Sequence, residues 1–486
     1  MKALRLMALA AWALGCAEIV EHPVRAHLAV SRTACNGRDF AAGASGWRLR
    51  VLMGATLQAE QAGQVVDGFP AEVEIPDGAD VTVRLEVFEG TPGMSRLVAW
   101  GQSRTVTADE PREELFLTVP LAPPEQFVDL CVRLARARGG HTATRLADGK
   151  VVLVGGTTGG ANPSTHDSLE LLDPYARTVE TSGSLTLITT VGSIVLAIED
   201  QAAVPYTPSQ VLLWGGRSMS PGGKVSTSLV AVWDAEVQKM GVVPPSPEAS
   251  VARFGHTLIR EGNEFFALGG LTGAPASPLP VAEIELVDEG GRRSVAGLLS
   301  PSLAFSAVSG SRLGAVVAGG ESLATGEVSS SVQVLRLGRT VQSRWSGLLA
   351  TPRARATAFP LGDGVLIAGG VDGNGQAIGT TEWLRDGSPP RLVPGPAILP
   401  RETPCAAPLG DGRVLLLGGV ANGQLSNAAE LLSPDGTATP VDFPGPPRRA
   451  HTCTTLADGS VLVTGGLTTG DDALGDVWRY LPAPPP

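Results

Sequence analysis

RRAHTCTTLADGSVLVTGG, residues Arg448–Gly466, holds the pattern that decides the fold of this 486-residue chain. An Arg and a His precede a short apolar strand, an Asp-Gly pair, a second apolar strand and a diglycine. Asp-Gly between two apolar runs is a strong signal for a tight β-hairpin, because a type I′ turn requires positive φ at both central residues. Nearly the same order occurs in RGGHTATRLADGKVVLVGG (Arg138–Gly156) and in RETPCAAPLGDGRVLLLGG (Arg401–Gly419).

A diglycine closes a short apolar run seven times, at Gly155-Gly156, Gly215-Gly216, Gly269-Gly270, Gly319-Gly320, Gly369-Gly370, Gly418-Gly419 and Gly465-Gly466. Successive pairs lie roughly 50 residues apart, and such a period indicates one supersecondary unit that is copied and stacked. After each pair, a polar loop leads to a third predicted strand, such as SLELLDP (Ser168–Pro174) or AAELLSP (Ala428–Pro434), and most repeats add a variable fourth strand. Because 43% of the residues are hydrophobic, the many glycines and prolines indicate turns rather than disorder.

Four strands per unit, with this Arg/His, turn and diglycine signature, resemble the kelch repeat of galactose-oxidase-like β-propellers. The resemblance covers about residues 125–482 and implies an all-β, kelch-type propeller. The second repeat departs from it with a predicted insertion at Glu199–Pro208, and the fourth repeat lacks the Arg and His. The tryptophan that is usual in the fourth strand is mostly missing.

The two ends of the repeat array predict the number of blades. The last repeat stops at Leu481-Pro482 after its third strand, whereas FVDLCVRL (Phe127–Leu134) is a strand-like run that belongs to no complete repeat. Because a propeller removes its open edges by closing the ring, this run is predicted to supply the missing outer strand of the last blade. The sequence therefore predicts seven blades. Six remain an alternative, in which the second or fourth repeat is something else.

Residues 17–121 carry no diglycine repeat. Stretches such as WRLRVLM (Trp47–Met53) and VTVRLEVF (Val81–Phe88) alternate polar and apolar residues, which is typical of half-buried antiparallel strands. We expect a small β-sandwich, immunoglobulin-like or transthyretin-like, that serves as a spacer or docking module. Ala122-Pro123-Pro124 forms a stiff break before the repeats.

Residues 1–16 are predicted to be a targeting segment. Lys2 and Arg5 precede an apolar run, Leu6–Leu14, that has the length of a signal-peptide core and is too short to span a bilayer. The segment ends in ALGC, which resembles the bacterial lipobox, although Ala13 stands where Leu is usual. The resemblance implies lipid attachment at Cys16 and, with Ala17 next, an outer-membrane location, periplasmic or surface-exposed. An ordinary secretory signal with an incidental cysteine is the alternative.

Charge and cysteine content narrow the possible environments. With 37 Lys and Arg against 48 Asp and Glu, the net charge is −11, and no basic run is present, which argues against nucleic acid as a partner. Two disulfides among the other four cysteines would suit an oxidising envelope, and four cysteines allow three pairings: Cys35, Cys131, Cys405 and Cys453. Cys405 and Cys453 lie in equivalent strands but are offset by one residue. They would therefore point to opposite faces of ideal strands, which leaves two unpaired thiols as an alternative.

The sequence contains no recognisable catalytic set. The copper oxidase of this fold class uses two tyrosines, two histidines and a crosslinked cysteine, whereas three of the six histidines here occupy one repeated position and the chain has three tyrosines. Neither HxH nor GxSxG occurs. We therefore predict no metal and no cofactor, and an enzyme remains the less favoured possibility.

One repeated residue type could bind a ligand. An Arg precedes the innermost strand in five repeats: Arg138, Arg253, Arg353, Arg401 and Arg448. As a ring near one mouth of the central channel, these arginines would suit an anionic group. We favour a structural role over this binding role: each Arg would bond backbone carbonyls of the neighbouring blade and hold the blades together.

Taken together, these patterns predict a lipid-anchored envelope protein whose propeller is a protein-binding or scaffold module. A carbohydrate-active or carbohydrate-binding propeller is the alternative. The loops that follow the diglycines are the best candidates for binding, including Thr157–Asn162, Arg217–Gly223, Leu271–Pro278 and Val371–Gly375. Few aromatic residues are available to stack on sugars.

Overall fold

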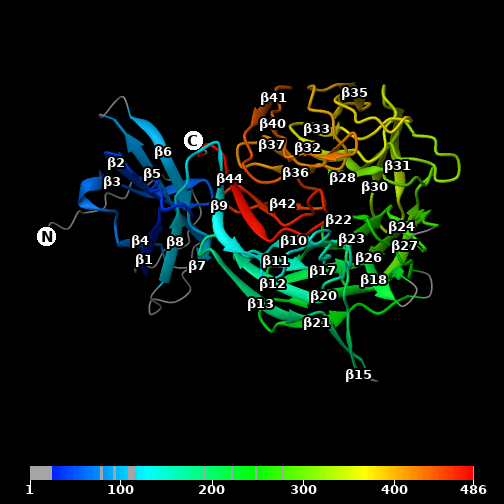
Figure 1. The fold of residues 1–486 in the computed structure, drawn as a ribbon, viewed down its shortest axis with the longest axis horizontal. Coiled ribbons are helices and arrows are strands. Elements are labelled where there is room, and N and C mark those ends of the chain that lie inside the picture. The colour runs from blue at the N-terminus through cyan, green and yellow to red at the C-terminus, as the bar shows by residue number, and fades with distance from the viewer. Residues whose placement is uncertain are drawn as a thin grey trace, which may run out of the picture.

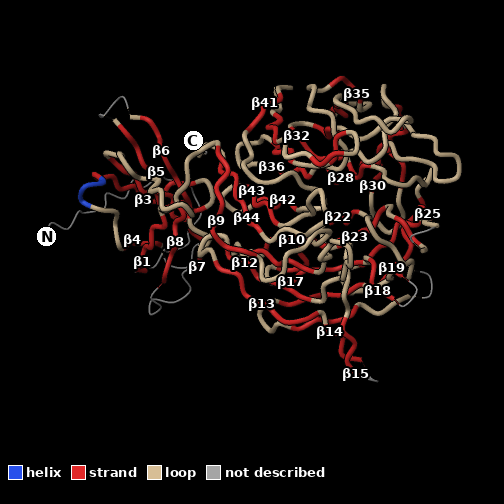
Figure 2. The backbone as a smooth tube through the Cα atoms, in the orientation of Figure 1, coloured by secondary structure: helices blue, strands red, loops and turns tan. Residues whose placement is uncertain are grey.

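The computed structural model describes residues 24–76, 80–90, 95–107, 115–189, 192–220, 223–246, 249–274 and 277–484. The prediction of an all-β chain is confirmed. Within these ranges the helical content is one single-turn 3₁₀ segment, η1 (Val65–Asp67), and Figure 2 shows strands and loops elsewhere. A smaller N-terminal domain lies beside a larger domain (Figure 1).

The N-terminal domain consists of two sheets that share one hydrophobic core. One sheet has the order β4–β1–β8, and the other has β3–β2–β5–β6 with β7 beside β5. Trp100 is fully buried in the core between them. The strands are β1 (Val24–Ser31), β2 (Gly46–Met53), β3 (Thr56–Gln64), β4 (Glu72–Ile75), β5 (Asp80–Glu89), β6 (Arg96–Gln102), β7 (Val106–Thr107) and β8 (Leu115–Pro120).

The larger domain contains seven four-stranded antiparallel sheets within the described ranges, here called the first to the seventh sheet. The first sheet is β10 (Thr142–Arg145), β11 (Val151–Val154), β12 (Ser168–Asp173) and β13 (Thr178–Ser184). The second is β16 (Ala202–Thr207), β17 (Gln210–Trp214), β20 (Val230–Asp234) and β21 (Lys239–Val242). The third is β22 (Thr257–Glu261), β23 (Glu264–Leu268), β26 (Glu283–Val287) and β27 (Arg293–Leu298).

The remaining sheets follow the same plan. The fourth is β28 (Ala307–Ser311), β29 (Gly314–Ala318), β30 (Ser331–Arg336) and β31 (Gln342–Leu348). The fifth is β32 (Thr357–Leu361), β33 (Gly364–Ala368), β34 (Thr381–Arg385) and β35 (Arg391–Pro394). The sixth is β36 (Cys405–Pro408), β37 (Val414–Leu417), β40 (Ala429–Leu432) and β41 (Ala438–Val441). The seventh is β42 (Thr452–Thr455), β43 (Val461–Thr464), β44 (Asp476–Leu481) and β9 (Gln126–Arg133).

Consecutive sheets pack face to face. The first strand of each sheet contacts the first strand of the next, and β42 of the seventh sheet contacts β10 of the first. The second strands are almost wholly apolar and buried on both faces, so that Val152 and Val154 face one neighbouring sheet while Val151 and Leu153 face the other. This explains why the runs before the diglycines lack the alternation of a solvent-exposed strand.

The fourth strand of the seventh sheet comes from the other end of the repeat array. β9 pairs antiparallel with β44, with Phe127 opposite Tyr480 and Val128 opposite Arg479. Phe127, Val128 and Leu130 are buried, so the strand contributes apolar side chains as well as backbone hydrogen bonds.

The prediction for the second repeat was wrong. Residues 202–207, assigned to an insertion, form β16, the first strand of the second sheet, which turns tightly into β17 between Thr207 and Gln210. The additional segment is the hairpin of β14 (Thr186–Thr189) and β15 (Gly192–Val195), which extends from the body of the domain (Figure 1). The first strand of this repeat lacks the Arg, His and Asp-Gly pattern, so its position could not be predicted from the repeats.

Several contacts join the two domains within the described ranges. The disulfide Cys35–Cys131 links the N-terminal domain to β9. The indole N–H of Trp100 donates a hydrogen bond to the carbonyl of Pro482 over 2.8 Å. At the junction, Glu125 accepts hydrogen bonds from Arg413 and Tyr480, and these bonds lower the pKa of its carboxyl group although burial by itself would raise it.

No described segment forms a helix with the length and apolar character needed to cross a membrane.

Candidate functional site

The diglycines lie where consecutive sheets approach each other most closely. Gly215 and Gly216 both have positive φ, at 64° and 103°, and the N–H of Gly216 donates to the carbonyl of Arg253 in the next sheet over 2.7 Å. A Cβ on Gly215 would collide with that same carbonyl. Glycine is therefore required for conformation and for space. The same bond joins Gly466 of the seventh sheet to Arg138 of the first.

The five repeated arginines are buried inside the sheets. Each guanidinium group forms an ion pair with an acid of the third strand in its own sheet, and each Arg residue is 0% exposed. Arg353 illustrates the geometry: it donates to the carbonyls of Gly369 and Thr380 over 2.9 and 2.8 Å and lies 3.1 Å from Glu382. The five pairs are Arg138–Glu170, Arg253–Glu285, Arg353–Glu382, Arg401–Glu430 and Arg448–Asp476.

The two sheets that lack the Arg also lack the acid. In the fourth sheet, Leu303 precedes the first strand where Arg353 does in the fifth, and Gln333 occupies the position of Glu382. In the second sheet, the corresponding residues are Ile198 and Ala231. Loss of both partners together is what a buried ion pair requires, since either charge alone would be buried without compensation.

These contacts correct one detail of the sequence interpretation. The guanidinium groups bond carbonyls of their own sheet rather than those of the neighbouring blade, and it is the main-chain carbonyl of each Arg that bonds the preceding sheet. A ring of exposed arginines at a channel mouth is not present, because all five side chains are buried. The acidic partners were missed, although a Glu recurs at one position of four third strands: Glu170, Glu285, Glu382 and Glu430.

The repeated histidines also belong to the framework. His141, His256 and His451 each lie against the first glycine of the preceding sheet, where a Cβ would meet the imidazole ring. Burial, together with the nearby arginine, lowers the pKa of all three, and that of His451 to about 3. They are therefore neutral, space-filling groups at physiological pH.

The cysteines of the sixth and seventh sheets form a disulfide, Cys405–Cys453, with a Cα–Cα distance of 5.8 Å. The argument from their one-residue offset was wrong. The two strands belong to different sheets that stack face to face, so an odd offset directs the side chains toward each other. His451 lies beside the two sulfurs, and Cys405, His451 and Cys453 are the one group in the described ranges with the spacing of a metal site. In the disulfide form the sulfurs are not thiolates and so are not metal ligands.

One end of the larger domain carries a ring of seven equivalent backbone positions with positive φ, and this end is here called the mouth. The equivalent residue before each first strand has positive φ: Gly140, Asp200, Gly255, Phe305, Arg355, Thr403 and Ala450. Main-chain hydrogen bonds join neighbours in this ring, including Gly140 N–H to Ala450 O at 2.8 Å, which connects the first sheet with the seventh. Gly140 and Gly255 adopt positive φ without strain, whereas positive φ in the five other residues costs about 1–3 kcal/mol each, which the surrounding structure must offset.

Charged side chains gather at the mouth beside the second sheet. Glu199 is 2% exposed and lies 2.6 Å from Lys224 and 3.0 Å from Arg217. Arg217 also pairs with Asp200 and stacks over Phe254, 4.6 Å from the ring centre. These groups line a cavity of about 280 Å³. Because its charges are largely paired with each other, the cavity has no evident excess of either sign.

The loops after the second and third diglycines carry short hairpins at the mouth. They form the hairpins β18 (Arg217–Ser220) with β19 (Gly223–Ser226) and β24 (Leu271–Thr272) with β25 (Leu279–Pro280). Phe254, Leu271 and Ala304 form a separate buried cluster that spans the third and fourth sheets. Four apolar side chains of the hairpins and of the loop before β28 are exposed, here called the mouth surface: Met219 (49%), Val225 (42%), Leu279 (62%) and Phe305 (38%). Residues 221, 222, 275 and 276 of the predicted binding loops, and the predicted lipid site Cys16, lie outside the described ranges.

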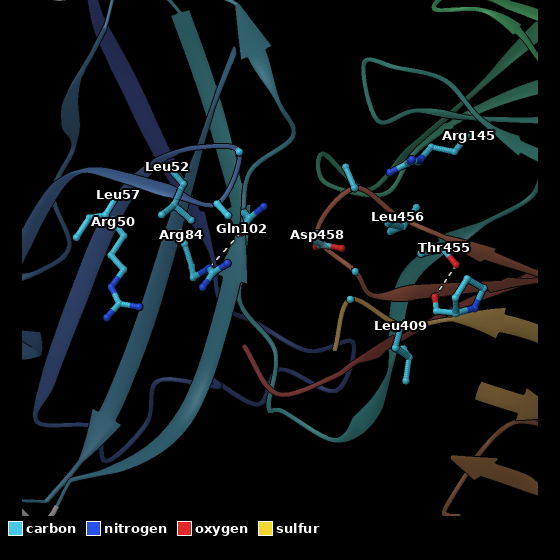
Figure 3. Close-up of a pocket in the computed structure, with 16 residues that line it drawn as sticks. Arg50, Leu52, Leu57, Arg84, Gln102, Arg145, Leu409, Thr455, Leu456 and Asp458 are labelled. Atoms are coloured by element: carbon cyan, nitrogen blue, oxygen red, sulfur yellow. Dashed lines mark hydrogen bonds between the residues drawn. The ribbon is translucent and has the colours of Figure 1, made fainter. Parts of the chain in front are cut away.

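A larger cavity, of about 730 Å³, lies between the two domains (Figure 3). Arg50, Arg84 and Gln102 line it from the N-terminal domain, and Arg145 and Asp458 line it from the larger domain. No sequence pattern indicated this cavity, because it depends on how the two domains are placed.

Comparison with known proteins adds little to these observations. No protein-family model matches the sequence, and no curated protein matches it. Among solved structures, the chain is similar to that of YjhT, with 13% sequence identity, a TM-score of 0.47, and coverage of 64% of this chain and 100% of that chain.

Proposed function

We propose that the seven sheets are the blades of a closed, kelch-type β-propeller, which carries a non-catalytic binding module on its mouth. Face-to-face packing of successive sheets, contact between the first and last of them, and the β9–β44 pairing support this proposal. In such a ring, the Arg–acid pairs, histidines and diglycines form the frame. The functional residues are then those that differ from sheet to sheet.

The single observation that carries the binding role is the mouth surface. Met219 and Val225 come from the β18–β19 hairpin, Leu279 comes from β25 and Phe305 from the loop before β28, and all four are exposed although apolar. Exposed apolar side chains on the loops at one end of a domain are often found at protein-binding surfaces. We propose a protein partner rather than a glycan, since none of the four residues is a Trp or Tyr that could stack on a sugar.

The triple variant M219S/L279S/F305S tests this role. We expect it to fold normally, because the three side chains are exposed, and to lose the partner by at least about tenfold, since truncating an interface anchor costs roughly 2 kcal/mol or more. The measurement is crosslinking of purified protein in an envelope extract, followed by quantitative mass spectrometry. L298S/L348S is the matched control, because these side chains are 64% and 71% exposed on the outer strands β27 and β31. Equal recovery of every captured protein by the two variants would contradict the proposal.

We further propose that the protein is exported and held at a bacterial envelope membrane by a lipid on Cys16. The support is the targeting pattern of residues 1–16 alone. Wild-type protein should partition with membranes and incorporate labelled palmitate, whereas Cys16→Ser should be released and unlabelled. Recovery of the wild type as an unlabelled soluble protein would refute the anchor.

A further inference from the structure

The cavity between the two domains has a one-sided balance of charge. Three arginines line it, Arg50, Arg84 and Arg145, whereas Asp458 is the one acid among its lining residues. The Asp458 side chain is 0% exposed and is already paired with Arg479. In a protein with a net charge of −11, this cavity is a local concentration of positive charge.

The three arginines differ in how far they are already engaged. Arg50 lies 2.9 Å from Glu60 and 3.4 Å from Glu86, and Arg84 donates to Gln102 over 3.1 Å. Arg145 ends β10 and is exposed, and no acid of the described ranges lies within ion-pair distance of it. Figure 3 shows its side chain extending from the larger domain toward the cavity. Arg145 is therefore the group most available to a ligand.

The rest of the lining is largely apolar. Leu52 and Leu57 come from the β2–β3 hairpin, and Leu409 and Leu456 come from the sixth and seventh sheets. Leu57 is 49% exposed at the cavity, so an apolar group placed there would remove it from water. Apolar walls with a few placed charges, at the boundary of two domains, are the usual features of a small-molecule site.

We propose that this cavity binds a small organic anion, with a carboxylate held by Arg145 and an apolar body packed on the leucines. A guanidinium group matches a carboxylate with two parallel hydrogen bonds, and the low polarity of the walls strengthens that interaction. The site is independent of the mouth surface and of the partner proposed for it. Because the cavity has walls from both domains, its ligand also holds the domains together.

Titration of the full-length chain with octanoate, followed by calorimetry and by thermal unfolding, tests the proposal. We expect saturable binding that raises the melting temperature, as any ligand specific to the folded state does. Octan-1-ol, which lacks the charge, should bind at least about tenfold more weakly. The variant Arg145→Gln should bind octanoate at least about tenfold more weakly than the wild type does. Without ligand, the melting temperature of this variant should equal that of the wild type, because Arg145 is exposed and unpaired within the described ranges.

Arg312→Gln is the matched control, since Arg312 is also exposed and follows the first strand of the fourth sheet, β28, far from the N-terminal domain in the order of sheets. Octanoate should bind this control as tightly as it binds the wild type. The proposal is overturned if the wild type shows no saturable binding, if octanol binds equally well, or if the two arginine variants behave alike.

Discussion

Replacing β9 (Gln126–Arg133) by a Gly/Ser segment of equal length that keeps Cys131 is expected to abolish cooperative folding of the larger domain. The replacement removes three buried apolar side chains, Phe127, Val128 and Leu130, each worth roughly 1.5–3 kcal/mol. It also leaves the hydrogen-bonding edge of β44 unpaired, which favours aggregation. The combined loss is comparable with the whole stability of a typical domain, about 5–15 kcal/mol. Chemical denaturation followed by circular dichroism measures it.

The matched control is the same replacement of β13 (Thr178–Ser184), the outer strand of the first sheet. β13 has a mostly exposed burial pattern and follows directly on its neighbour β12 in the chain. We expect this control to lower stability by a few kcal/mol at most and to leave a soluble protein. If the β9 variant unfolds at the same denaturant concentration as the β13 variant, β9 does not close the ring.

Arg353→Ala is expected to lower the free energy of unfolding by about 3–5 kcal/mol, because it leaves the Glu382 carboxylate buried without its partner. Arg355→Ala is the matched control. Its side chain is 39% exposed in an ion pair with Glu402, so its removal should cost less than about 1 kcal/mol. If the repeated arginines were instead a ligand site, Arg353→Ala would unfold like the wild type and lose only binding of an anionic partner.

The chain itself supplies a rescue for this variant. The double variant R353L/E382Q copies the Leu303 and Gln333 pair of the fourth sheet, which removes both charges together. It should recover most of the stability lost in Arg353→Ala, since apolar replacement of a whole buried ion pair is often neutral. A double variant no more stable than Arg353→Ala would show that the carbonyl contacts of Arg353, rather than its charge pairing, account for the loss.

How much of this could be predicted from sequence depended on whether a residue repeats. The hairpins and the diglycines follow from patterns that recur about every 50 residues. The strand at 127–134 follows from a mismatch between the two ends of the repeat array. Where the second repeat lost its Arg, His and Asp-Gly, β16 was mistaken for an insertion. The direction in which Cys405 and Cys453 point depends on sheets stacking face to face, which the pattern of one strand does not contain.

The candidate sites were less predictable, for a related reason. The repeated arginines suggested a possible binding role because they recur, and they recur because five of the seven sheets share the same internal ion pair. The mouth surface and the cavity beside Arg145 are made of residues that appear once each. Only the three-dimensional placement of loops and domains brings such residues together.

The pairing of β9 with β44 also has a consequence for how the chain folds. Glu125, next to β9, and Tyr480, in β44, hydrogen-bond across 355 residues of sequence, so this contact must wait until the 355 residues that follow Glu125 have been synthesised. Every shorter nascent chain carries β9 as an apolar strand without its partner, a typical starting point for misassembly. The entropy lost in closing so long a loop adds little to the free-energy cost of folding at equilibrium, but it delays the step in which β9 pairs with β44. Synthesis of β44 thus determines when β9, the earliest strand of the larger domain, can take its place.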